Sequence, residues 1–173
     1  APRLVASLDA PGVPGSVSFA PSQPLLAVGL GSGVVQVWDL TDPGAPVKKR
    51  EFGDARSAID AVSFRPDASM LLAASGDDRI WGWDLTSEAN TAVLSVDGAL
   101  GSPWDVRVVQ GGTGFAVSGS TGMVRLWRLD VADANDRLCV VRGDPLTPEE
   151  WQRYLPGVEP KDLCSTGRGT TKR

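Results

Sequence analysis

The sequence predicts an all-β protein built from repeated units of four short antiparallel strands. Three observations lead to this prediction. Glycine and proline account for 20 and 13 of the 173 residues, and such residues separate the strands of chains that are rich in short strands. Short apolar segments alternate with turn-forming segments along most of the chain. Tryptophan recurs at a nearly constant interval, which indicates a repeated structural unit.

The repeat has a period of 44 or 45 residues. Trp38, Trp83 and Trp127 are separated by 45 and 44 positions, and Phe19 and Phe64 by 45. Asp60 and Asp105 also lie 45 positions apart. A period of about 40–45 residues with four strands per unit is typical of β-propeller blades.

Each unit is expected to contain its four strands in the same order. The first strands are expected at 16–20, 60–64 and 105–109, and the second strands at 25–30, 70–75 and 115–119. The third strands are expected at 34–39, 79–84 and 123–128, and the fourth at 47–52, 92–96 and 137–142. Clusters of Gly, Pro, Asp and Ser between these segments supply the turns.

The third-strand segments "VVQVWDL", "RIWGWDL" and "VRLWRLD" resemble the Trp-Asp ending found in WD-repeat β-propellers. The segments "SVSFAPS" and "AVSFRPD" resemble the first strand and following turn of that family. The resemblance covers residues 3–142 and implies a partial or open propeller within residues 1–143. It implies three complete blades, at about 15–53, 57–97 and 102–143.

The family usually joins a His, a Ser or Thr, a turn Asp and the Trp in one hydrogen-bonded group. Here the Trp matches in all three units, but only Asp77 matches the turn Asp, since Ser32 and Thr121 take the other two places. The chain has no His. The usual group is therefore expected to be absent, and the indole N–H groups need other partners.

The second unit is unusual because it reads Trp81-Gly82-Trp83. Side chains alternate along a strand, so the two indoles are expected on one face and Gly82 on the other. One interpretation is repacking, in which Gly82 leaves room for a bulky neighbour. The other is that Trp81 contacts a partner, because Trp is enriched at interface hot spots.

Residues 3–8, "RLVASL", are expected to form an extra outer strand that belongs to a preceding blade. This predicts that the chain is the C-terminal part of a larger propeller, or a half that needs a second chain. After the third blade, Thr147 and Glu150 form a capping box with Pro148 at the first helical position. A short capping helix that includes Trp151 is therefore expected within 144–164, followed by a flexible tail at 165–173.

Cys139 and Cys164 can form a disulfide that closes this cap, or both can stay reduced in a cytosolic setting. The tail looks like the C-terminal end of large actinobacterial WD-repeat proteins. Those proteins carry an upstream signalling NTPase of the STAND type, a protease-like domain or a kinase domain. The resemblance implies a sensor or scaffold part without the catalytic domain, and we expect a cytoplasmic location.

Composition argues against several classes of function. Without His, most metal sites and the Ser-His-Asp and Cys-His nucleophile arrangements are lost. The net charge is −4, so binding to nucleic acid is disfavoured. No run of 18 apolar residues is present, so no membrane insertion is expected. We expect no catalytic residue, no metal and no cofactor.

The expected function is binding of a protein or peptide, or of the remaining blades and upstream domain of a parent chain. Candidate contacts lie at the entry to first strands and in adjacent turns. They are Ser57, Ile59, Asp60, Asp78, Arg79, Trp81, Trp104 and Asp105. One alternative is an intramolecular clamp on an upstream NTPase or kinase domain. Another is a propeller enzyme, for which convergent acids, a metal or a His would be needed.

Overall fold

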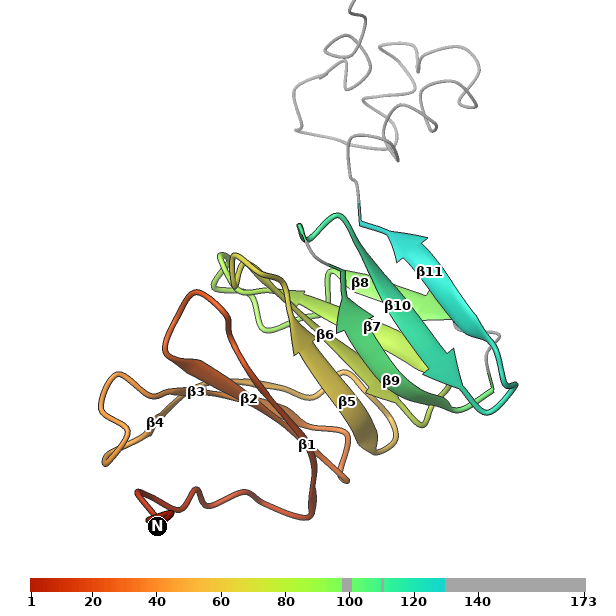
Figure 1. Ribbon diagram of the computed structural model, residues 1–173. Helices are drawn as coiled ribbons and strands as arrows, with labels where there is room; N and C mark the ends of the chain where they lie inside the picture. The colour runs from red at the N-terminus through yellow and green to blue at the C-terminus, as the bar shows by residue number, and fades with distance from the viewer. Residues whose placement is uncertain (98–100, 110, 130–173) are drawn as a thin grey trace, which may run out of the picture. The chain divides into compact units, whose positions relative to one another are not determined.

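The computed structural model describes residues 1–97, 101–109 and 111–129, and within them the chain forms three separate antiparallel sheets (Figure 1). The first sheet contains β1 (Pro14–Phe19), β2 (Leu25–Leu30), β3 (Val35–Asp39) and β4 (Val47–Phe52). The second contains β5 (Ile59–Phe64), β6 (Met70–Ser75), β7 (Arg79–Asp84) and β8 (Leu94–Asp97). The third contains β9 (Pro103–Val108), β10 (Gly114–Gly119) and β11 (Val124–Arg128). Within each sheet, strands that are consecutive in the sequence pair with each other, as in a meander.

These bounds agree with the expected strands to within two residues at each end. The strand expected at residues 3–8 is an exception, because these residues form no strand in the structure. A strand needs a neighbour to satisfy its backbone groups, and no described residue pairs with this segment. The fourth strand expected at 137–142, the cap with Thr147, Glu150 and Trp151, the two cysteines and the tail all lie outside the described residues.

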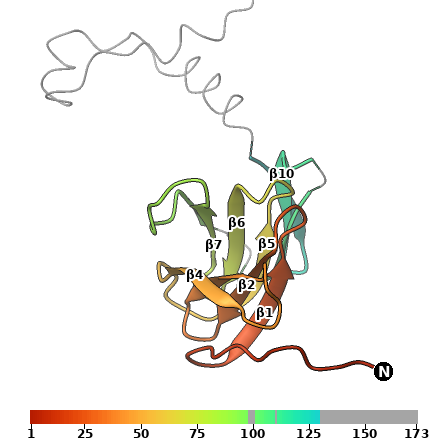
Figure 2. The same ribbon diagram turned by 90° about the vertical axis from the view of Figure 1, so that its left-hand side faces the viewer.

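The first strands of the three sheets lie side by side, β1 against β5 and β5 against β9 (Figures 1 and 2). One serine links each pair. The backbone N–H of Val62 in β5 donates to Ser16 Oγ of β1 at 3.2 Å. The N–H of Val108 in β9 donates to Ser63 Oγ of β5 at 3.1 Å. The sheets therefore stack face to face through their first strands, as propeller blades do around an axis.

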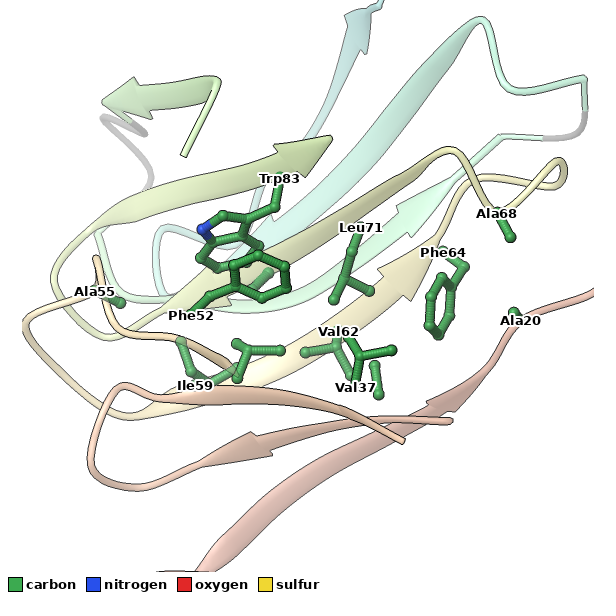
Figure 3. Packing of buried hydrophobic residues seen from close by; sticks show 13 residues of the cluster. Ala20, Val37, Phe52, Ala55, Ile59, Val62, Phe64, Ala68, Leu71 and Trp83 are labelled. Atoms are coloured by element: carbon green, nitrogen blue, oxygen red, sulfur yellow. The ribbon is translucent and has the colours of Figure 1, made fainter. Parts of the chain in front are cut away.

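The core lies between successive sheets. One cluster fills the space between the first and second sheets and includes Val37, Phe52, Val62, Leu71 and Trp83 (Figure 3). The rings of Phe52 in β4 and Trp83 in β7 stack with their centroids 5.0 Å apart. Fully burying an aromatic side chain contributes roughly 1.5–3 kcal/mol. Packing between sheets is therefore a main source of stability.

A second cluster fills the space between the second and third sheets. It includes Leu72 and Ile80 from the second sheet, and Val106, Phe115 and Val117 from the third. The two clusters use opposite faces of the second sheet, since Leu71 belongs to the first and Leu72 to the second. The central sheet is thus buried on both sides, which explains its continuous apolar strands.

The Trp81-Gly82-Trp83 segment in β7 follows the repacking interpretation. Trp81 and Trp83 both pack against the first cluster, so the two indoles share one face as predicted. On the other face, a Cβ on Gly82 would stand 2.9 Å from Leu94 Cβ and 3.0 Å from Leu72 Cδ2. Glycine is therefore required here because Leu72 and Leu94 occupy the space of its missing side chain.

Candidate functional site

Each first strand contains a β-bulge at the same structural position. The register shifts between Pro14 and Ser16 in β1 and between Ile59 and Ala61 in β5. In β9, Pro103 and Asp105 pair with β10 while Trp104 is left out of the ladder. The unpaired residues are Gly15, Asp60 and Trp104. Bulges re-aim side chains and are common near functional sites, and two of these three residues were candidate contacts.

The bulges also correct the alignment of the repeats. The 45-residue spacing of Asp60 and Asp105 predicted that these residues are equivalent. Asp105 pairs with Ser118 in the third sheet, and Ala61 pairs with Ala74 at the equivalent position of the second sheet. The residue equivalent to Asp60 is therefore Trp104. Equivalent positions in β5 and β9, the first strands of the second and third sheets, are thus 44 residues apart.

Asp60 lies beside the turn between β6 and β7. A Cβ on Gly76 in this turn would stand 2.9 Å from Ser57 Oγ and 3.7 Å from Asp60 Oδ2. The N–H of Gly76 donates to the carbonyl of Ala58 at 2.9 Å, and Ser75 Oγ donates to the carbonyl of Ser57 at 3.2 Å. These bonds hold the turn against the entry to β5. Ser57 and Asp60, which are both candidate contacts, therefore lie beside this turn.

Two carboxylates of this region have unused acceptor capacity. Partial burial raises the pKa of Asp60 above its usual value, and no described residue forms an ion pair or hydrogen bond with its side chain. Asp78 has a φ of 65°, in the left-handed region. Its Oδ1 atom is buried and has no hydrogen-bond partner among the described residues. The exposed Asp60 side chain can gain a donor from a partner, whereas the Asp78 Oδ1 atom is closed to solvent.

Asp77 already has partners within the chain. One of its oxygens accepts the backbone N–H of Arg56 at 2.9 Å, and both lie within 3.3 Å of Trp81 Nε1, which donates to them. Asp77 thus joins the β6–β7 turn to the loop before β5. This is a structural role, as the matching Asp of the repeat pattern predicts, but its indole partner is Trp81 and not Trp83.

The other candidates differ in accessibility. Trp104 is 61% exposed. Arg79 donates to Ser95 Oγ at 2.8 Å, and its guanidinium lies 5.9 Å from the centre of the Trp81 ring. Asp105 lies 3.1 Å from Arg107 Nε. Ile59 is 1% exposed and belongs to the first core cluster, so it is not an accessible contact. The second sheet is buried on both faces, so a place at the entry to β5 does not make a side chain accessible.

The three repeated tryptophans differ in how their N–H groups are satisfied. Trp83 Nε1 donates to Asp54 Oδ2 at 2.7 Å, and Trp38 Nε1 donates to Gln36 Oε1 at 3.3 Å. Trp127 Nε1 is buried and has no partner among the described residues. Sequence reasoning expected substitute partners but did not name Asp54 or Gln36. The signal for Asp54 is its place before the first strand, where the family has its His.

Comparison with known proteins supports the blade interpretation. The family model described as "WD domain, G-beta repeat" (WD40) matches residues 3–39 and 47–84. The chain contains WD40 repeats in two places. No curated protein matches the sequence. WD40 repeat domains are protein-interaction scaffolds in general and are typically non-catalytic, so the repeats point to binding. The antiparallel sheets of the chain are consistent with WD40 propeller blades.

The structure adds two observations on chemistry. Among residues 1–97, 101–109 and 111–129, no group of three or more acidic, Cys or His residues is arranged to hold a metal ion. Within the same residues, no helix has the length and apolar character needed to cross a bilayer.

Proposed function

We propose that this chain is a non-catalytic interaction module that forms the C-terminal WD40 part of a larger regulatory protein. Its binding surface lies at the bulged ends of β5 and β9 and at the β6–β7 turn. The observation that supports this most strongly is Trp104, a 61% exposed indole at a β-bulge on a first strand. An exposed large aromatic side chain on a rigid strand is a typical anchor for a protein partner.

The charge of the surface favours a partner segment that carries a basic side chain. Asp60 is partly desolvated, and one oxygen of Asp78 is buried without a donor from the described residues. A Lys or Arg from the partner would supply a donor and a positive charge to the Asp60 carboxylate, which is exposed. The face of Trp104 would also favour a cation, by about 0.5–1 kcal/mol at an exposed site. Ser57 and Arg79 border this surface and contribute polar contacts.

The proposal is tested by selecting peptides from a random displayed library on the immobilised full chain. We expect enriched peptides to contain Lys or Arg and to bind Trp104→Ala and Asp60→Asn at least tenfold more weakly. Val93→Ala is the matched control, because Val93 is 57% exposed and lies outside the proposed surface. Peptides that bind all four proteins equally would contradict the proposal.

The same experiment separates an autonomous binder from an intramolecular clamp. A chain that serves only to hold an upstream NTPase or kinase domain would enrich no peptide dependent on Trp104. A propeller enzyme would need convergent acids, a metal or a His as its reacting group, and the chain has no His.

A further inference from the structure

The two interfaces between sheets in this chain bury apolar side chains in the same way. Each sheet has a leading face, which is turned toward the preceding sheet, and a trailing face, which is turned toward the next. The trailing face of the first sheet buries Ala27, Val35 and Val37 against the leading face of the second. The trailing face of the second sheet buries Leu72 and Ile80 against the leading face of the third in the same manner.

The same two kinds of face remain open at the ends of the described stack. On the leading face of the first sheet, Val17 is 60% and Phe19 is 67% exposed. Val17 pairs with Val28 in the first sheet, and Val62 pairs with Ala73 at the equivalent position of the second sheet. Val17 and Phe19 are therefore structurally equivalent to Val62 and Phe64. Val62 and Phe64 are buried in the first cluster. Val17 and Phe19 are thus equivalent to residues that are buried at the interface between the first and second sheets.

The other half lies on the trailing face of the third sheet. Val124 is 70% and Leu126 is 77% exposed, on the strand β11. Leu126 pairs with Ala116 in the third sheet, and Gly82 pairs with Leu72 at the equivalent position of the second sheet. Val124 and Leu126 are therefore equivalent to Ile80 and Gly82 of β7. Ile80 is buried in the second cluster. Exposed apolar groups of this kind mark an interaction site.

The hydrogen bond between first strands can also be repeated. Ser16 Oγ accepts the N–H of Val62 across the first interface. Asp105 occupies the position of Ser16 in the third sheet, since Ser16 pairs with Gly29 as Asp105 pairs with Ser118. The residue that corresponds to Val62 in the first sheet is Val17. The Asp105 carboxylate is therefore placed to accept the N–H of a Val17 that docks on this face.

We infer that a second copy of this chain docks head to tail, with the trailing face of one third sheet against the leading face of the other first sheet. A second copy is the occupant that the structure favours, because one chain carries both complementary halves and their inner strands offer the matching donor and acceptor. Such an interface is heterologous, so the two copies contribute different surfaces. This inference is independent of the peptide surface at Trp104.

The test is the mass of the full chain in solution by light scattering or sedimentation. The wild type is expected to exceed the 18.2 kDa of one chain, with a mass that rises with concentration or settles at a closed oligomer. Phe19→Asp places a charge on the leading face of the first sheet and leaves the trailing face of the third sheet intact. Leu126→Asp does the reverse. Each variant alone is expected to stay monomeric, whereas the control Val93→Asp on the middle sheet associates as the wild type does.

The decisive arm is an equimolar mixture of Phe19→Asp and Leu126→Asp. Each variant keeps one intact face, so the mixture is expected to form a dimer of twice 18.2 kDa and nothing larger. A dimer also shows that both variants are folded. Val17→Asp and Val124→Asp provide a second pair with the same expectation. Asp105→Ala is expected to weaken association about tenfold, the effect of one lost hydrogen bond.

Three results would overturn the inference. A wild type that remains at 18.2 kDa up to high concentration excludes a second copy. This is also the result expected if residues 130–173 cover an open face of the same chain. A mixture of folded variants that yields no dimer excludes a head-to-tail interface. Association that survives in both single variants indicates nonspecific contact of exposed apolar groups.

Discussion

Asp54 accepts the indole N–H of Trp83 at 2.7 Å, although the two residues lie 29 positions apart. Trp83 is completely buried at the centre of the first core cluster. Asp54 precedes β5 in the chain, and Trp83 lies on β7 of the same sheet. This single bond therefore ties the loop that enters the second sheet to the largest side chain in the core.

Removing this acceptor should destabilise the protein. In Asp54→Ala the indole N–H would be buried without a partner, so we expect a loss of about 1–3 kcal/mol of unfolding free energy. Chemical denaturation followed by Trp fluorescence measures the loss. Asp9→Ala is the matched control, because Asp9 lies 45 positions earlier, is exposed and forms no hydrogen bond or ion pair with a described residue. Equal stability of the two variants would show that the bond contributes nothing.

Trp127 offers a contrasting case. Its buried Nε1 has no acceptor among the described residues, and the chain has Gly98 and Ala99 at the positions 44 and 45 residues after Asp54. Replacing either indole by Phe loses contact area, but only Trp83→Phe also leaves a hydrogen-bond partner behind. We expect Trp83→Phe to cost about 1 kcal/mol more than Trp127→Phe in unfolding experiments. A larger loss for Trp127→Phe would point to a strong partner of its N–H group.

Gly82 tests the packing between the second and third sheets. Gly82→Ala places a methyl group 2.9 Å from Leu94 Cβ, where a real Cβ contact does not occur. Overpacking of this kind costs about 1–3 kcal/mol, which we expect as a lower denaturation midpoint. Gly53→Ala is the control, since nothing lies within 4 Å of its added Cβ. It should change stability by no more than about 0.5 kcal/mol.

Two aspartates at the ends of β3 and β7 are expected to make the stability of the protein depend on pH in acid. Asp39 Oδ1 accepts both the hydroxyl and the backbone N–H of Thr41, at 2.6 and 2.8 Å. These bonds, with a smaller effect of Lys49, lower the pKa of Asp39 from 3.8 to about 2. Asp84 and Thr86 form the same pair, and the pKa of Asp84 is also lowered.

Because the folded pKa of Asp39 is depressed, its contribution to stability is present above pH 3.8 and is lost as pH falls toward 2. Thr41→Val removes the main cause of the shift. The pKa of Asp39 should then rise toward its usual value in an NMR titration of the carboxyl groups, and acid unfolding should need less acid. Thr121→Val, at an exposed turn residue without a described partner, should leave that pKa unchanged. No change in Thr41→Val would refute the assignment.

The sequence predicted the strands well because two strong local signals coincide in each unit. The Trp at the end of each third strand and the Gly-rich turn before it fix the position of both neighbours, as β6 and β7 illustrate. The alternation around Gly82 predicted correctly that Trp81 and Trp83 share a face. These are short-range effects that depend only on strand geometry.

The candidate surface was harder to predict because it depends on register. Ile59 is buried because the second sheet is covered on both faces, although the next residue, Asp60, is exposed at the bulge. The period shortens to 44 residues in the third unit, which moves Trp104 and not Asp105 into the place of Asp60. Asp54 was not predicted because the family pattern has a His at this place, whereas any oxygen acceptor there can satisfy an indole N–H.

The sheets stack face to face through β1, β5 and β9, and amide hydrogen exchange tests this stacking directly. The amides of Val62 and Val108 bond to serines of the neighbouring sheet, at Ser16 and Ser63. Ser16→Ala should therefore accelerate exchange at Val62 about tenfold and leave Val108 unchanged, and Ser63→Ala should do the reverse. If both amides exchange at their wild-type rates in these variants, the first strands do not meet across the sheets as described.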